Sequence, residues 1–284
     1  MTLRKSNIVE TDTGGRNPAR IFLQRSFVMK YIQHLYPIIS KEILGKNLFS
    51  YVIQCPDLAS IAKPGQFVHI LPNGKTLRRP ISICEIHPKQ GTIRIVFEAK
   101  GEGTVQLACF NTGDCMDILG PLGNGFTILP KDKKIILIGG GIGTPPMVAL
   151  AQHYKKNATV ISGFRSAELV MLQQDFSDAG AHTILCTDNG TAGQHAMVTE
   201  PLKECLSQYT PDLIYACGPI PMLKAIAAIA NEKNIACEVS LEERMGCGIG
   251  ACLVCACKLN RNGQEVAAHV CKDGPVFSSK EVIW

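Results

Sequence analysis

The sequence has few charged residues, few aromatic residues and no long apolar stretch. Of its 284 residues, 19% are charged, 6% are aromatic and one is tryptophan, whereas 46% are hydrophobic. This composition excludes a disordered chain and favours a folded one of about two domains. The longest nearly continuous apolar run, from 135 to 143, is too short and too rich in glycine to cross a bilayer. We therefore expect no membrane-spanning segment.

Several catalytic motifs are also missing. The sequence contains no G-x-S-x-G nucleophile elbow, no P-loop and no H-E-x-x-H zinc motif. Its seven histidines form no pair at zinc-site spacing, so any metal has to depend on cysteine. No secretory signal follows Met1, and thirteen cysteines without an export signal predict reduced thiols in the cytoplasm.

The net charge of +5 is concentrated near the start of the sequence. Residues 1–37 carry six basic and two acidic side chains, and the remainder is nearly neutral. A nearly neutral body predicts no nucleic-acid-binding face. The basic extension 1–37 has three interpretations: a targeting arm, a flexible contact for a partner, or untranslated sequence upstream of a start at Met29. The last two are favoured, because serine is sparse and no amphipathic pattern is present.

Three regions follow the extension. Residues 38–130 contain short β-rich runs between turns, which predicts a small antiparallel barrel. These runs are Leu48–Cys55, Gln66–Leu71, Ile81–Ile86 and Thr92–Ala99. From 131 to 236 strand-like and helix-like runs alternate, which predicts βαβ units around a parallel sheet. Residues 237–284 form a tail rich in glycine and cysteine.

The most specific motif lies in this tail. Cys247, Cys252 and Cys255 are followed by Cys271, with the spacing C-x4-C-x2-C-x15-C. Four thiolates on a glycine-rich loop suit a 2Fe–2S cluster, because glycine lets backbone N–H groups turn towards the cluster's sulfides. The alternative is a structural zinc site, although zinc ribbons usually pair two C-x2-C knuckles and only one is clear here. The spacing makes Cys257 the spare thiol.

Two motifs in the barrel region predict a phosphate or flavin site. The segment Arg79-Pro80-Ile81-Ser82 places a guanidinium and a hydroxyl at the entry of a strand. The segment Gly101–Thr104 opens a short helix expected over 105–110, whose N–H groups offer a pyrophosphate site. Each motif alone is also typical of a surface turn. The two in this order favour a cofactor site.

A glycine run predicts a nucleotide site in the α/β region. Residues 137–146 predict a buried strand, a glycine turn and a helix start with Thr144 as its N-cap. The run lacks the G-x-G-x-x-G fingerprint, so a tight strand–helix connection is the alternative. Cys217-Gly218-Pro219 ends another strand at the sheet edge where α/β proteins bind ligands, although free cysteine is often only a small buried apolar residue. Arg165 follows the second strand where an acidic residue is absent, which leaves NAD and NADP open.

In this order, the motifs resemble those of the electron-transfer subunits of NAD-dependent dihydroorotate dehydrogenases, within the ferredoxin-reductase superfamily. The resemblance runs from about residue 38 to the end, includes Gly120–Phe126 and Glu242–Cys247, and is most specific in Cys271–Phe277. It implies a multidomain β plus α/β fold. The implied parts are an FAD-binding β-barrel (38–130), an NAD-binding α/β domain (131–236) and a small 2Fe–2S domain (237–284).

The resemblance and the motifs assign binding residues to each cofactor. The implied FAD contacts are Arg79, Pro80, Ile81, Ser82, Val96, Phe97, Glu98, Gly103 and Thr104. The expected NAD contacts are Gly140, Gly141, Gly143, Thr144, Cys217, Gly218 and Pro219. The expected cluster ligands are Cys247, Cys252, Cys255 and Cys271.

The resemblance also implies a redox adaptor in pyrimidine (UMP) biosynthesis. Electrons would pass from an FMN-containing dihydroorotate dehydrogenase subunit, within a heterotetramer, through the cluster and FAD to NAD+. Hydride transfer needs no side chain as acid or base, so we name no catalytic residue. One alternative is an NAD(P)H reductase that serves a ferredoxin, a sulfur reductase or an oxygenase. Another is a zinc-stabilised nucleotide-binding regulatory module.

Overall fold

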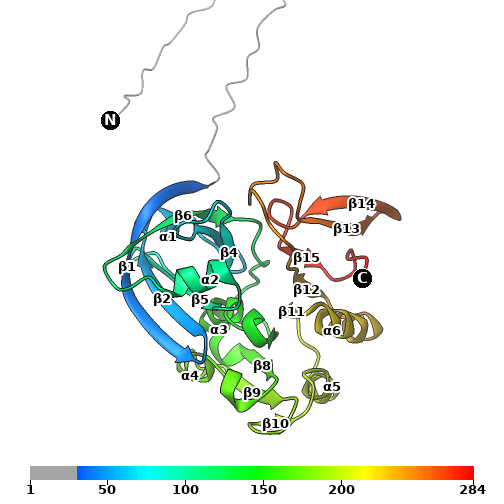
Figure 1. Ribbon diagram of the computed structural model, residues 1–284. Helices are drawn as coiled ribbons and strands as arrows, with labels where there is room; N and C mark the ends of the chain where they lie inside the picture. Colours follow the sequence, from blue (N-terminus) through cyan, green and yellow to red (C-terminus); the bar gives the residue numbers. More distant parts are fainter. Residues whose placement is uncertain (1–30) are drawn as a thin grey trace, which may run out of the picture.

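The computed structural model describes residues 31–284, which form a β-barrel, an α/β layer and a small cysteine-rich lobe (Figure 1). Residues 1–30 of the expected basic extension lie outside the described residues. Within residues 31–284, no helix is long and apolar enough to span a membrane.

The barrel is closed by six strands in the order β1-β2-β5-β4-β3-β6, which confirms the antiparallel barrel predicted from the sequence. The strands are β1 (Ile32–Gly45), β2 (Leu48–Gln54), β3 (Phe67–Leu71), β4 (Arg79–His87), β5 (Thr92–Glu98) and β6 (Cys115–Leu122). Strand β1 pairs with β6 from Ile32 onward, so the barrel begins before the expected boundary at residue 38. Alternate residues of β3, such as Val68 and Ile70, are fully buried in the barrel interior.

Two short helices, α1 (Pro56–Ile61) and α2 (Glu102–Ala108), complete the barrel region. Helix α2 starts before the expected 105–110, because Gly101 is already its N-cap. The Thr104 hydroxyl accepts hydrogen bonds from the N–H groups of Lys100 (2.9 Å) and Gly101 (3.1 Å), which fixes the turn into the helix.

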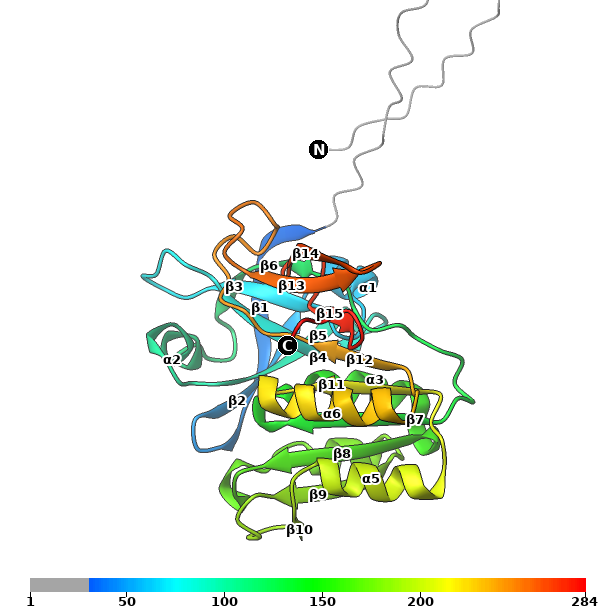
Figure 2. The same ribbon diagram turned by 90° about the vertical axis from the view of Figure 1, so that its right-hand side faces the viewer.

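The α/β layer is a seven-stranded sheet in the order β10-β9-β8-β7-β11-β12-β15. Its strands are β7 (Ile135–Gly140), β8 (Ala158–Phe164), β9 (His182–Thr187), β10 (Gln194–His195), β11 (Leu213–Cys217), β12 (Cys237–Ser240) and β15 (Val276–Ser278). Helices α5 (Thr199–Gln208) and α6 (Ile220–Glu232) cover one face, and α3 (Pro146–Tyr154) and α4 (Gln173–Asp178) pack on the other (Figure 2). All strand pairs are parallel except β12 with β15, which confirms the predicted α/β layer.

The cysteine-rich tail is joined to this sheet rather than separate from it. Strand β12 pairs with β11 from Ile214↔Cys237 to Cys217↔Ser240, and β15 adds the last strand. The expected boundary at 236/237 therefore falls inside the sheet, because β12, the last parallel strand on this side, comes from the tail. The hairpin β13 (Ala256–Arg261) and β14 (Gln264–His269) forms the remaining lobe.

A shared core and a buried ion network join the barrel to the α/β layer. Leu48, Cys84 and Val96 of the barrel pack in one cluster with residues of β7, β8 and α3. Beside this cluster, Arg94 on β5 contacts Asp175 on α4 and also donates to the Ser50 hydroxyl at 2.8 Å. Arg94 lies 3.5 Å from Glu85 as well, and that carboxylate accepts a 2.5 Å hydrogen bond from the α3 side chain of Gln152. These contacts fix the orientation of the two layers.

Replacement of Arg94 by methionine should lower the free energy of unfolding by about 2–4 kcal/mol, because two part-buried carboxylates would lose their cation. Arg94, Glu85 and Asp175 are only 11%, 12% and 22% exposed. Urea denaturation measures the effect. The matched control is Lys133→Met, whose pair with Asp212 is exposed on both sides and should contribute little. An Arg94→Met midpoint equal to that of the wild type would contradict this expectation.

Candidate functional site

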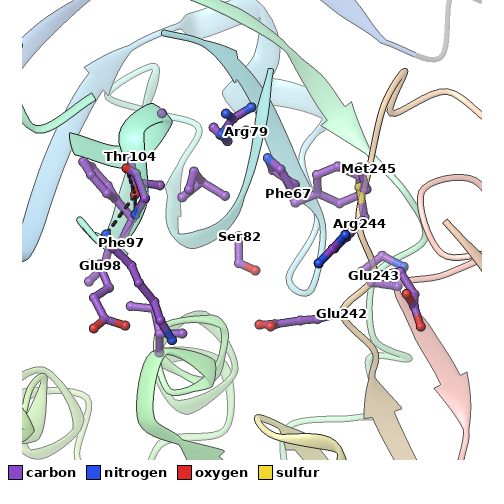
Figure 3. Close-up of a pocket in the computed structure, with 18 of the residues that line it drawn as sticks. Phe67, Arg79, Ser82, Phe97, Glu98, Thr104, Glu242, Glu243, Arg244 and Met245 are labelled. Carbon is purple, nitrogen blue, oxygen red and sulfur yellow. Dashed lines mark hydrogen bonds between the residues drawn. The ribbon is translucent and has the colours of Figure 1, made fainter. Parts of the chain in front are cut away.

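A cleft of about 790 Å³ lies where the barrel, the carboxyl ends of the parallel strands and the start of the cysteine-rich lobe meet. All nine residues predicted to contact FAD line it: Arg79, Pro80, Ile81, Ser82, Val96, Phe97, Glu98, Gly103 and Thr104. In Figure 3, Arg79, Thr104 and Phe97 lie on the barrel side, the segment Glu242–Met245 lies opposite, and Ser82 lies between them. The cleft has the size of a cofactor pocket.

Arg79 has the chemistry to bind a phosphate. Its N–H groups donate to the backbone carbonyls of Leu77 at 2.9 Å and Arg78 at 3.2 Å, and no ion pair with a carboxylate forms within the described chain. The guanidinium packs against Gly103 so closely that any Cβ there would collide with it. Gly103 therefore leaves the space in which the Arg79 side chain reaches the cleft. A guanidinium without an anionic partner suits a pyrophosphate.

The opposite wall consists of residues that the sequence reasoning did not assign to binding. It is lined by Ser240, Leu241, Glu242, Glu243, Arg244 and Met245, and Phe67, Lys100 and Ile142 line other parts of the cleft. Desolvation by the surrounding protein raises the pKa of Glu242, and the charge of Lys100 opposes this shift. The signal that was missed is the position of Ser240 at the carboxyl end of a parallel strand, next to Cys217.

The two turns predicted to bind a nucleotide lie side by side. Strands β7 and β11 are parallel neighbours with Gly139 opposite Cys217, and they mark the point where the strand order reverses. Gly143 approaches the Cys217 carbonyl so closely that a Cβ would collide with it, and a Cβ on Gly140 would lie 2.5 Å from the Met222 sulfur. Close packing of the two turns therefore requires these two glycines.

Of the predicted NAD residues, only Cys217 lines the cleft. The others flank it in the two turns: Gly140, Gly141, Gly143, Thr144, Gly218 and Pro219. Gly141 has a φ of +53° and nothing within 4 Å of a Cβ built on it, so its outer side is open to a ligand. The prediction of Thr144 as N-cap is wrong: residues 141–143 form a 3-10 turn and α3 begins at Pro146 with Pro145 as its cap. Thr144 is instead fully buried, with no partner for its hydroxyl within the described residues.

The expected cluster ligands are surrounded by backbone N–H groups. The N–H of Ala251 lies 3.2 Å from the Cys247 sulfur, and the N–H of Gly250 lies 3.1 Å from the Cys271 sulfur. The four cysteines also interact in pairs: the Cys247 N–H donates to the Cys252 sulfur at 3.3 Å, and the Cys271 N–H donates to the Cys255 sulfur at 3.4 Å. Four cysteines in two adjacent pairs, with N–H groups aimed at their sulfurs, fit the four-thiolate ligand set of a 2Fe–2S cluster.

Within residues 31–284, no three His, Cys, Asp or Glu side chains converge on one point. The assignment of the four cysteines to a cluster therefore rests on their arrangement in two pairs and on the N–H groups that point at their sulfurs. The loop itself bends through two glycines in left-handed conformations, Gly248 (φ +75°) and Gly250 (φ +82°). At such φ values only glycine avoids strain. The glycines therefore permit the path of the loop around the sulfurs.

The thiols of this region differ in acidity. Burial opposes ionisation of Cys247, but hydrogen bonds, chiefly from the N–H groups of Ile249 and Cys252, outweigh it and lower the pKa of Cys247 to about 6. Burial raises the pKa of Cys257 to about 11. At neutral pH Cys247 is therefore mostly thiolate without metal, and Cys257 is a thiol.

Removal of iron with a chelator should make Cys247 the faster of these two thiols in alkylation at pH 7, because the thiolate is the nucleophile. We expect iodoacetamide to label Cys247 at least about tenfold faster than Cys257, as measured by peptide mass spectrometry. The iron-loaded protein is the control, in which Cys247 should be protected. Equal labelling of the two thiols after iron removal would contradict the assignment.

Comparison with known proteins identifies the same family that the sequence motifs resemble. A family model described as the iron–sulfur cluster binding domain of dihydroorotate dehydrogenase B matches residues 242–283. The dihydroorotate dehydrogenase B (NAD(+)) electron transfer subunit of Geobacillus kaustophilus is 39% identical over 255 residues, which cover 87% of this chain and 96% of the relative. The protein of the same name from Desulforamulus reducens is 37% identical over 253 residues, which cover 87% and 97%.

Solved structures share the fold. A structure of NADH-dependent reduced ferredoxin-NADP oxidoreductase, described in work on flavin-based electron bifurcation, is 30% identical with a TM-score of 0.78, and the match covers 88% of this chain and 90% of that one. The ferredoxin reductase of carbazole 1,9a-dioxygenase is 20% identical with a TM-score of 0.62, covering 72% and 67%, and supports the fold alone. The identity and coverage of the curated relatives confirm the resemblance seen in the sequence: the chain belongs to the family of dihydroorotate dehydrogenase B (NAD+) electron transfer subunits.

Proposed function

We propose that this chain carries electrons between a catalytic dihydroorotate dehydrogenase subunit and NAD+ through a 2Fe–2S cluster and FAD. When bound, the cluster carries one electron at a time, and FAD exchanges single electrons with it and a hydride with nicotinamide. One observation carries the proposal. The segment that lines the cleft up to Met245 continues directly into Cys247, so the flavin cleft and the cysteine loop are adjacent.

The chain's own residues bind and orient the groups. Arg79 would pair with the FAD pyrophosphate, and the backbone of Val96–Glu98 and the Ser82 hydroxyl would hold the flavin. The turn at Gly141, at the carboxyl end of β7, would receive NAD+ beside the cleft. The four cysteines would hold the irons. Since hydride transfer requires no side-chain proton, no catalytic residue is proposed.

The partner is assigned through the printed name of the relatives, which describes an electron transfer subunit of dihydroorotate dehydrogenase B. A partner that contains FMN, a heterotetramer and a role in pyrimidine biosynthesis are parts of this proposal. Ile249, Leu253 and Val254 are exposed apolar side chains around Cys252, which suits a covered interface. A cytoplasmic location also belongs to the proposal, because all thirteen cysteines lie in the described chain and none is in a disulfide.

Reconstitution with the catalytic subunit tests the proposal. The purified chain should contain FAD, iron and inorganic sulfide, with flavin bands and a broad cluster absorption in its visible spectrum. Addition of the FMN-containing subunit should then give reduction of NAD+ that depends on dihydroorotate. A colourless chain with stoichiometric zinc would support the regulatory module instead and refute the proposal.

A second candidate is favoured by the 30% identical structure of the ferredoxin-NADP oxidoreductase. In that case the chain would serve a ferredoxin-linked partner, and dihydroorotate would not be an electron donor. Co-purification separates the two candidates: an FMN-containing dihydroorotate dehydrogenase subunit supports the first, and activity with reduced ferredoxin without that subunit supports the second.

A further inference from the structure

A buried histidine lies between the flavin cleft and the cysteine loop. His69 on β3 is fully buried, and neither ring nitrogen makes a hydrogen bond of normal geometry within the described chain, although the backbones of Arg78 and Cys247 lie within interaction range of the ring. A buried polar ring with no well-formed hydrogen bond is costly, so its presence calls for a function. His69 is not among the residues assigned to FAD, NAD or the cluster.

Its position connects the two sites. Phe67 and His69 lie two residues apart on β3, so their side chains share one face of the strand. Phe67 lines the cleft, whereas a Cβ built on Gly248 of the cysteine loop would lie 2.5 Å from His69 Nδ1. The imidazole therefore packs against the backbone of the loop, one residue after the ligand Cys247.

The barrel holds this histidine rigidly. Arg78 donates to the His69 carbonyl at 3.2 Å and to the Asp117 carbonyl at 3.1 Å. Arg78 also makes two 2.9 Å hydrogen bonds to the Asp117 carboxylate, so it ties the backbone of His69 to β6. A ring fixed in this way limits how closely the loop can approach the barrel.

We propose that His69 is a positioning residue for the iron–sulfur centre: its ring sets the position of the Cys247–Gly248 backbone relative to the barrel strand that lines the flavin cleft. The inference rests on the proposed function, because it requires a cluster on this loop. It predicts that a change in the contact between His69 and Gly248 alters the cluster without a loss of FAD.

The matched pair Gly248→Ala and Gly250→Ala tests the contact in the full chain. Both glycines have a positive φ, so alanine adds similar strain at each, but only Gly248 abuts His69, whereas Gly250 faces the flexible Lys272 side chain. Anaerobically purified variants would be analysed for iron, sulfide and FAD, and by electron paramagnetic resonance and redox titration of the reduced cluster. We expect Gly248→Ala to lose at least half of its cluster or to shift its spectrum and potential clearly more than Gly250→Ala does. Equal effects of the two variants would overturn the proposal.

Variants of His69 separate an effect of the His69–Gly248 contact on the cluster from a general loss of protein stability. His69→Ala, combined with Gly248→Ala, removes the contact with the imidazole and leaves only Leu122 Cδ1 close to the new Cβ, at 3.1 Å, so the cluster content or spectrum should return towards that of His69→Ala alone. His69→Leu should shift the spectrum and potential more than His69→Gln, which keeps a polar side chain. Wild-type spectra and potentials in every His69 variant would overturn the proposal, while a wild-type chain without iron would instead refute the proposed function. FAD content is the folding control in each case.

Discussion

Replacement of Cys252 by serine is expected to abolish the dihydroorotate-dependent reduction of NAD+ while the chain keeps its FAD. Cys252 is one of the four expected ligands, and its sulfur interacts with Cys247 across the loop. Changes even to the outer partners of metal ligands cost 10–100-fold in affinity or activity, so loss of a ligand should cost at least about 100-fold. The cleft residues are unchanged, so NADH oxidation with an artificial dye, which needs only FAD, should remain.

The two activities are measured on the same preparation, with the catalytic subunit present for the first and absent for the second. Cys257→Ser is the matched control, because Cys257 lies in the same region, on β13, but is not an expected ligand. It should keep both activities. Retained electron flow from dihydroorotate in Cys252→Ser would remove the cluster from the proposed path.

The second large effect is expected at Arg79, whose sequence neighbour Arg78 provides the control. Arg79→Ala should weaken FAD binding by about 10–100-fold, since a charge-assisted hydrogen bond contributes about 1.5–3 kcal/mol. The FAD-free variant should unfold near the wild-type urea midpoint, because Arg79 makes hydrogen bonds only to nearby backbone carbonyls. Fluorescence titration with FAD measures the affinity.

Arg78→Ala should have the opposite pattern. Arg78 is 15% exposed and forms a bidentate pair with Asp117, which is 25% exposed, so loss of the guanidinium leaves a part-buried carboxylate unpaired. We expect about 1–3 kcal/mol of lost stability and a smaller loss of FAD affinity than in Arg79→Ala. Similar FAD affinities in the two variants would show that Arg79 does not bind the cofactor.

Sequence reasoning found residues that line or flank the cleft, because the patterns that it uses are local. The spacing of Cys247, Cys252 and Cys255 places three thiols on one loop whatever the rest of the chain does. The Arg79–Ser82 motif and the glycine run likewise lie within short segments, and the structure places the first in the cleft and the second beside it. The roles of these residues as cofactor contacts remain predictions.

The expected boundaries were less successful, since they depend on pairing between distant segments. Ile32–Pro37 belongs to the barrel only because it pairs with β6, and β12 belongs to the α/β sheet only because it pairs with β11. Neither segment carries a local signal that identifies its partner strand. The helix begins at Pro146 with Pro145 as its cap, one residue later than an N-cap at Thr144 requires, because the glycines form a 3-10 turn before the helix.

The sequence alone determined the barrel, the α/β alternation and the four-cysteine spacing, because periodicity, turn residues and ligand spacing act over a few residues. Only the tertiary structure decided that Glu242–Met245 lines the cleft opposite the barrel, that Arg94 joins the two layers and that His69 meets Gly248. These contacts join residues from about eighty to nearly one hundred and eighty positions apart in the sequence. These contacts depend on which side chains are buried together and on how closely two backbones approach. Residue types within one segment do not reveal either.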